Sequence, residues 1–140
     1  TETGPKVIEF NARFGDPETQ VVLARLESPL SEIISSLLAK EQPTIAWNEL
    51  ASVGVVVAAE GYPNQYKTNL PLPEMSGETI HYAGVTRSEQ ALVSAGGRIF
   101  LAEATASTLE EARKKVYQTL DNYSFPGMYY RKDIGVKGLI

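Results

Sequence analysis

The chain has 140 residues, a net charge of −4, no cysteine and a hydrophobic share of 43%, which is ordinary for a globular protein. The length suffices for one modest domain, or for a small domain with a flanking piece. An acidic chain without a long basic block is not typical of nucleic-acid-binding domains, and no apolar run approaches the ~18 residues that span a bilayer. The absence of cysteine excludes disulfides and thiolate sites and is compatible with an intracellular setting.

The first predicted element is a strand over residues 6–12. In a strand, Glu9, Asn11 and Arg13 point to one face and the apolar residues between them to the other. Carboxylate and amide oxygens about 6.6 Å apart along a strand suit Mg²⁺, and an adjacent guanidinium suits a carboxylate or phosphate. The pattern indicates metal-assisted handling of an anionic substrate. A half-solvated strand without a metal site is the alternative.

A turn and a helix follow this strand. Gly15 permits a sharp bend, Asp16 is a good N-cap residue and Pro17 suits the first helical position. We therefore expect a helix over residues 17–27, with Glu18 in its first turn.

A second helix is predicted after Pro29, because apolar residues recur there at helical spacing. We interpret it as a packing helix, with a functional docking helix as the alternative. It ends at Gln42-Pro43, and the change of pattern beyond it places a domain boundary near residue 45. The predicted packing residues are Leu30, Ile33, Ile34, Leu37 and Leu38.

Strand-like patterns dominate the next stretch. A valine-rich strand is predicted over residues 52–60, then a turn at 61–64, a surface loop over 64–78 and a strand over 78–85. Two further strand-like runs flank Gly96-Gly97, and we predict a β-hairpin there. A nucleotide-binding glycine loop is the alternative, but no helix and no Lys-Ser/Thr pair follows these glycines.

A final helix is predicted from residues 107–109. Both Ser107 with Glu110 and Thr108 with Glu111 fit a capping box. The expected buried stripe of this helix is Leu109, Ala112, Val116 and Leu120. The chain then closes with two tyrosines and a basic and acidic string at 129–133, which we interpret as packing plus a surface ion pair rather than a base-stacking platform.

The string Arg13-Phe14-Gly15-Asp16-Pro17-Glu18-Thr19-Gln20 closely resembles the signature of the phosphoribosylamine–glycine ligase family, in the ATP-grasp superfamily. The resemblance continues in Gly-Tyr-Pro at 61–63 and in the aromatic followed by Arg-x-Asp-Ile-Gly that ends at 135. It covers residues 7–20 strongly and 50–135 more loosely.

This resemblance implies an α+β fold in two parts. Residues 1–45 would form the C-terminal end of an ATP-grasp catalytic domain, a strand plus helices. Residues 46–140 would form a small, mostly antiparallel β-sheet domain with one packing helix. We also expect the ATP site to lie in an upstream part of the same chain, so the 140 residues are expected to be inactive alone.

The implied reaction is the ATP-dependent joining of glycine to 5-phosphoribosylamine via glycyl phosphate, in cytoplasmic purine biosynthesis. By the same resemblance, Glu9 and Asn11 hold Mg²⁺ or Mn²⁺, and Arg13 steadies the glycine carboxylate or the acyl phosphate. Asp16 and Glu18 lie at the turn. The interpretation of Asp16 as a helix cap competes with a substrate role, in which one of these two carboxylates receives the glycine ammonium group.

One family feature departs from this sequence. The family shows His-Ala-Gly where this chain has Tyr82-Ala83-Gly84, with His81 one position earlier. A shift of one residue in a strand moves the side chain to the opposite face, so we assign His81 no role. Two other functions stay open from the sequence: a different ATP-grasp ligase or carboxylase, and a non-catalytic structural domain.

Overall fold

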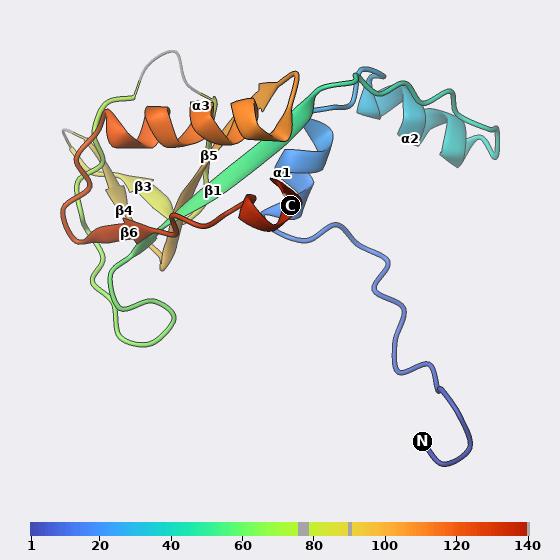
Figure 1. The fold of residues 1–140 in the computed structure, drawn as a ribbon, viewed down its shortest axis with the longest axis horizontal. Helices are drawn as coiled ribbons and strands as arrows, with labels where there is room; N and C mark the ends of the chain where they lie inside the picture. The colour runs from blue at the N-terminus through green and yellow to red at the C-terminus, as the bar shows by residue number, and fades with distance from the viewer. Residues whose placement is uncertain (76–78, 90, 140) are drawn as a thin grey trace.

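The computed structural model describes residues 1–75, 79–89 and 91–139. Its centre is an antiparallel sheet of four strands in the order β2-β5-β1-β6 (Figure 1). These strands are β1 (Ala51–Ala59), β2 (Thr79–Tyr82), β5 (Arg98–Ala106) and β6 (Met128–Tyr130). A separate antiparallel pair consists of β3 (Val85–Arg87) and β4 (Leu92–Ser94).

The long pair β1 and β5 forms the middle of the sheet, and it confirms the valine-rich strand predicted over 52–60. Val55 lies opposite Ala102, and the register shifts between Val57 and Ala58. Val53, Val55 and Val57 alternate along β1 and are at most 4% exposed. This period of two places them on one face, where they form part of the hydrophobic core.

Helix α3 (Leu109–Asp121) packs on that face (Figure 1). Of the two predicted caps, the structure uses Thr108, whose Oγ1 accepts a hydrogen bond from the Glu111 N–H at 3.2 Å; the return bond to the Glu111 carboxylate that would complete a capping box is not found among the described residues. The predicted stripe is confirmed, because Leu109 packs against the core and the other three residues are fully buried. Tyr117, which the periodicity did not single out, is also buried.

Helix α1 (Glu18–Leu23) lies on the opposite face of the sheet. Gly54 of β1 makes room for it, since a Cβ there would lie 2.6 Å from Val21 Cγ2 and 2.9 Å from Leu101 Cδ1. Leu101 is 3% exposed although it points away from the α3 side. The sheet is thus covered by one helix on each face.

The predicted strand over residues 6–12 is wrong for this structure. These residues are exposed and extended, and no described strand pairs with them. A strand needs hydrogen bonds to a neighbour, and alternation of side chains alone does not supply one. The segment instead leads away from the body of the molecule (Figure 1).

The two N-terminal helices also differ from expectation. Helix α1 is shorter than the predicted 17–27, and its cap position is occupied by Pro17 without a side-chain cap bond among the described residues. Helix α2 (Leu30–Leu38) confirms the second predicted helix, but its packing role is wrong here. Only Ile33 is buried, because α2 projects beyond the sheet (Figure 1). The other four residues predicted to pack are 45–80% exposed: Leu30, Ile34, Leu37 and Leu38.

The predicted hairpin around Gly96-Gly97 is wrong as well. Its two arms, β4 and β5, belong to different sheets, because β4 pairs with β3 while β5 pairs with β1 and β2. The predicted strand over 78–85 is correspondingly split at Ala83-Gly84, with residue 78 outside the described residues. Gly84 and Gly96 cross closely there: a Cβ on Gly84 would lie 2.8 Å from Gly96 Cα.

The structure therefore confirms a small, mostly antiparallel sheet domain with a packing helix. No helix among the described residues has the length and apolar character required to cross a membrane.

Candidate functional site

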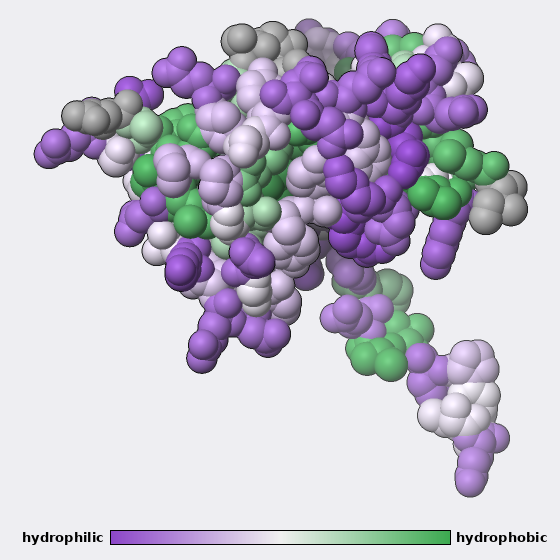
Figure 2. Space-filling view, turned by 60° about the vertical axis from the view of Figure 1, so that its left-hand side comes forward, coloured by the Kyte–Doolittle hydropathy of each residue, from purple (hydrophilic) through white to green (hydrophobic). Residues whose placement is uncertain are grey.

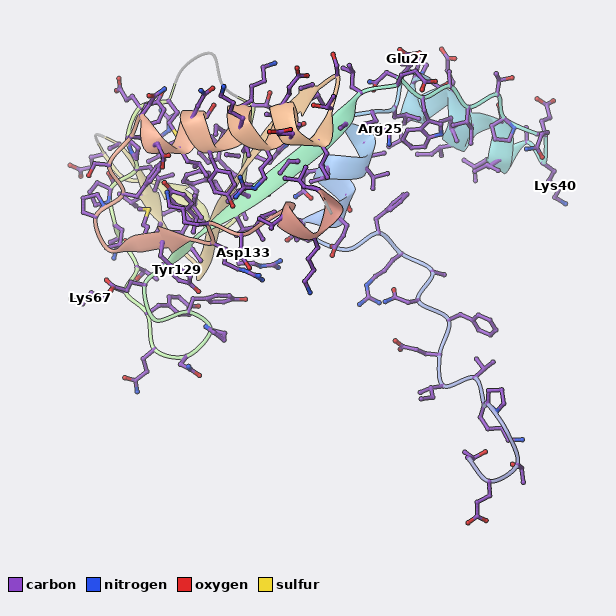
Figure 3. The ribbon with its side chains drawn as sticks, in the orientation of Figure 1. Arg25, Glu27, Lys40, Lys67, Tyr129 and Asp133 are labelled. Carbon is purple, nitrogen blue, oxygen red and sulfur yellow. The ribbon has the colours of Figure 1, made fainter. Side chains whose placement is uncertain are left out.

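The predicted metal ligands lie on the exposed N-terminal segment, which we define as residues 5–15. Glu9 and Asn11 are both exposed, and neither side chain makes a hydrogen bond or ion pair with any described residue. The apolar side chains of this segment are exposed too, and Figure 2 shows them as hydrophobic surface on a protruding arm. In Figure 3 the side chains of the arm point into open space.

The donor set fits a hard cation. Glu9 and Asn11 offer a carboxylate and an amide oxygen, and both are free to coordinate. Within residues 1–75, 79–89 and 91–139, no group of three or more His, Cys, Asp or Glu side chains is placed to hold a metal ion. Mg²⁺ commonly takes one or two protein oxygens and fills its other positions with phosphate oxygens and water.

Arg13 lies in a bend at the end of this arm and is exposed. The turn behind it is ordered by the backbone of Gly15, whose carbonyl oxygen accepts from the Thr19 N–H at 3.0 Å and from Thr19 Oγ1 at 2.6 Å. The Glu18 carboxylate folds over Gly15, so a Cβ at Gly15 would overlap it. Glu18 itself is exposed in the first turn of α1.

Asp16 does not cap α1; its carboxylate makes other contacts. Oδ2 pairs with Arg98 Nη2 at 3.1 Å, and Oδ1 accepts from Gln20 Nε2 at 3.2 Å. Arg98 Nη1 also donates to the Asp16 carbonyl oxygen at 2.5 Å. The structure thus joins the signature turn to the first residue of β5, which lies 82 positions later in the chain.

Two buried polar atoms lie beside one groove between α1 and the sheet. Gln20 Oε1 on α1 and His81 Nε2 on β2 are buried, and neither has a hydrogen-bond partner among the described residues. Both side chains line one groove of about 410 Å³, together with Glu103 and Thr105 of β5. Buried polar atoms of this kind are usually bridged by water.

Sequence reasoning gave Arg98 no role, quoted Gln20 only as part of the signature string, and considered His81 without assigning it a role. Arg98 opens a run that is otherwise apolar, 98–102, and this is the signal that could have marked it. The hairpin prediction placed it in the strand-like run after Gly96-Gly97 and gave it no role. Its partner could not be found without knowing that α1 returns to the sheet.

The predicted C-terminal ion pair is confirmed: Arg131 Nη2 lies 2.6 Å from Asp133 Oδ2. The two tyrosines point in different directions. Tyr130 packs near Tyr117 and Phe125, with ring centroids 6.3 and 6.2 Å away, while Tyr129 is 42% exposed. The packing interpretation of this string therefore holds.

A second charged cluster joins α3 to the chain after β6. Lys132 Nζ donates to Asp121 Oδ1 and to Tyr130 Oη, at 2.8 Å in both cases, and Tyr130 Oη donates to Asp121 Oδ1 at 2.7 Å. The hydrogen bond from Lys132, followed by that from Tyr130, lowers the pKa of Asp121. The same bond to Asp121 raises the pKa of Lys132. This cluster holds the chain after β6 against α3.

Comparisons with known proteins agree on one family. The family model for phosphoribosylglycinamide synthetase, C domain, matches residues 52–137. The chain is 50% identical to the phosphoribosylamine–glycine ligase of Halalkalibacterium halodurans and 49% identical to that of Lactococcus lactis, over 99% of its length in both cases. It spans about a third of the length of these relatives, 33% and 34%.

A solved structure shows the same fold. The crystal structure of the phosphoribosylamine–glycine ligase from Thermotoga maritima superposes with a TM-score of 0.82 at 31% sequence identity. The match covers 92% of this chain and 33% of that chain.

Proposed function

The chain belongs to the phosphoribosylglycinamide synthetase family, whose C domain it carries, and from this premise we propose that it acts as part of a phosphoribosylamine–glycine ligase. The observation that carries the proposal is similarity to ligases over 99% of the chain, across both the N-terminal arm and the sheet domain. We further propose that residues 1–45 are the end of the ATP-grasp domain and 46–140 the C-terminal domain of a cytoplasmic enzyme of purine biosynthesis.

The proposed reaction has two steps. The glycine carboxylate attacks the γ-phosphorus of ATP, which gives glycyl phosphate and ADP. The amine of 5-phosphoribosylamine then attacks the acyl carbon, and phosphate leaves as the C–N bond of glycinamide ribonucleotide forms. Both steps gather negative charge at one place, so they require cationic groups around the phosphoryl oxygens.

The exposed arm supplies groups suited to that requirement. We propose that Glu9 and Asn11 hold Mg²⁺ or Mn²⁺, because they are hard oxygen donors without partners among the described residues. When bound, the ion would neutralise charge on phosphate oxygens. We assign Arg13, which is exposed and makes no side-chain hydrogen bond or ion pair with the described residues, to the glycine carboxylate or acyl phosphate, since a guanidinium binds two oxygens at once.

The turn residues complete the proposal. Glu18 is exposed at the start of α1 and is available to receive the glycine ammonium group. Asp16 already contacts Arg98 and Gln20, so of the two carboxylates Glu18 is the better candidate for that role.

A chimeric ligase tests the proposal. Residues 1–140 replace the corresponding C-terminal third of the Halalkalibacterium halodurans ligase, and ADP release is measured with and without glycine and phosphoribosylamine. We expect release that depends on both substrates, and a loss of about 100-fold or more for Glu9→Gln or Asn11→Ala. Arg13→Ala should reduce turnover far more than it weakens ATP binding.

Glu2→Gln is the matched control, because it makes the same chemical change on an exposed carboxylate outside the signature. It should leave ADP release unchanged. A folded chimera that releases no ADP, or one in which Glu9→Gln is as active as the parent, would contradict the proposal and favour a structural role. Activity with a different acyl or amine substrate would instead indicate another ATP-grasp ligase.

A further inference from the structure

We infer that Arg98 is a positioning residue for this reaction: it binds Asp16 and thereby restricts the position of Arg13. The inference rests on the proposed function. It assigns a role in the active site to a side chain of the sheet domain that lies outside the signature string.

The Arg98 guanidinium makes two contacts with Asp16. One guanidinium nitrogen of Arg98 donates to the backbone carbonyl of Asp16 at 2.5 Å, and the other pairs with the Asp16 carboxylate at 3.1 Å. Two bonds from a planar group to two atoms of the same residue fix its orientation as well as its position. A lysine ammonium lacks this planar geometry.

The Arg98 end of the contact is rigid. Arg98 begins β5, where its backbone pairs with Ala58 of β1, and its carbonyl oxygen accepts from the Gly84 N–H at 2.9 Å. The next residue, Ile99, is 0% exposed. The backbone that carries the guanidinium is therefore held by pairing with β1 and by the hydrogen bond from Gly84.

The Asp16 end is held from a second side. Gln20 Nε2 donates to the same carboxylate, and Thr19 donates twice to the carbonyl oxygen of Gly15. Arg13 is three residues from Asp16, so the chain allows it at most about 10 Å from that anchor. Glu9 is seven residues away and has about 25 Å of reach, so Arg98 constrains Arg13 much more tightly than it constrains the metal ligands.

A structural explanation is weaker. The Arg98 and Asp16 side chains are 40% and 52% exposed, and ion pairs at that exposure contribute little to the free energy of unfolding. The contact between Arg98 and Asp16 therefore matters for the orientation that it imposes on the turn more than for the free energy of unfolding. The expected signature is thus a change in turnover with little change in the melting temperature.

The test uses the chimeric ligase with Arg98→Ala, Arg98→Lys and Asp16→Asn. We expect Arg98→Ala to lower kcat by about 10- to 100-fold, the size of effect that a misplacement near 1 Å produces, while KM for ATP stays within about twofold. Arg98→Lys should recover only part of kcat. Combining Arg98→Ala with Asp16→Asn should cost no more than the larger single loss, because both act on one contact.

Lys115→Ala is the matched control. Lys115 of α3 also donates to a backbone carbonyl of β5, that of Thr105 at 3.2 Å, so its removal deletes an equal charge that contacts the same strand without touching the turn. It should leave kcat unchanged. If Arg98→Ala does not fold, Arg98→Gln is measured by the same criteria, since it keeps a donor at a similar reach.

The outcomes separate the two claims. A folded parent chimera without ligase activity overturns the proposed function. An active parent with an equally active Arg98→Ala overturns this inference alone, as do losses that multiply in the double variant. An Arg98→Ala protein that raises KM for ATP together with the loss of kcat shows that Arg98 acts on the nucleotide, and it also overturns the inference.

Discussion

The N-terminal arm and the sheet domain are built in opposite ways. In the arm, Ile8 and Phe10 are 97% and 87% exposed, although both are large and apolar. In the sheet domain, Ile99 and Phe100 are 0% and 1% exposed. The segment that contains the predicted site residues is therefore the most exposed part of the chain, whereas the core of the sheet domain consists of apolar side chains without catalytic groups.

The difference shows that the residues of the predicted site and the residues that stabilise the fold lie in separate parts of this chain. Burial of apolar surface on both faces of the sheet stabilises the domain, whereas the arm contributes oxygen and guanidinium groups that bury nothing in this structure. The two regions meet at α1 and at the contact between Asp16 and Arg98.

The same substitution made in each region should give the largest contrast. Phe100→Ala removes a fully buried ring beside Phe125 and should lower the free energy of unfolding by about 3–5 kcal/mol. Phe10→Ala should change it by less than about 0.5 kcal/mol, because the ring is exposed. Urea unfolding followed by circular dichroism measures both. A loss above 1 kcal/mol for Phe10→Ala, as judged against the typical surface range, would show that the arm packs on the body in solution.

A bulkier residue at Gly54 tests whether α1 belongs to the stable body. Gly54→Val puts atoms into the space filled by Val21 and Leu101, and overpacking of this kind costs about 1–3 kcal/mol. We also expect faster hydrogen exchange at the α1 amides. The paired variant Val21→Ala with Gly54→Val should recover part of the stability. Unchanged exchange in α1 would mean that this helix is not held by the sheet.

The parts of the fold that could be predicted are those fixed by local pattern. A short apolar run rich in β-branched residues identified β1, and apolar spacing together with a capping residue identified α3, since each pattern matches the burial of its own element. The predicted hairpin failed because pairing depends on which strands meet. The crossing of Gly84 and Gly96, which sends β4 and β5 into different sheets, is a tertiary contact between residues far apart in sequence.

The candidate site divides in the same way. Glu9, Asn11 and Arg13 could be proposed from the sequence because their residue types and spacing suit a metal ion and an anion, and the family resemblance implied their roles; those roles stay predictions. Arg98 could not be, since its role depends on the fold bringing β5 to the turn after Gly15. The N-terminal strand failed for the converse reason: its alternating pattern is present, but no described strand pairs with it.

The cap of α3 gives a smaller effect within the stable body. Thr108→Ala removes the oxygen that accepts from the Glu111 N–H and should cost about 1 kcal/mol. Ser107→Ala is the matched control: it removes a neighbouring hydroxyl, at the other position that fits a capping box, and should cost only a few tenths. Thermal unfolding distinguishes the two. Equal losses would show that the cap is shared between both hydroxyls.

The smallest expected effect concerns charge at the edge of the stable body. The pKa of Asp121 is lowered in the folded chain by its hydrogen bonds from Lys132 and Tyr130. The stabilisation that the ionised Asp121 contributes is therefore fully present above the ordinary aspartate pKa of about 3.9, and it is lost as the pH falls through the lower, folded value. The raised pKa of Lys132 sets the other limit, since its contribution is present below about 10.4 and is lost above the folded value. Asp121→Asn should therefore lower the melting temperature slightly between about pH 5 and 9, and the difference should vanish in acid and shrink with added salt. Glu41→Gln, an exposed carboxylate beyond α2, should show no such dependence. A difference that persists below the folded pKa would mean that Asp121 acts through packing, and burial alone would then account for the body's stability.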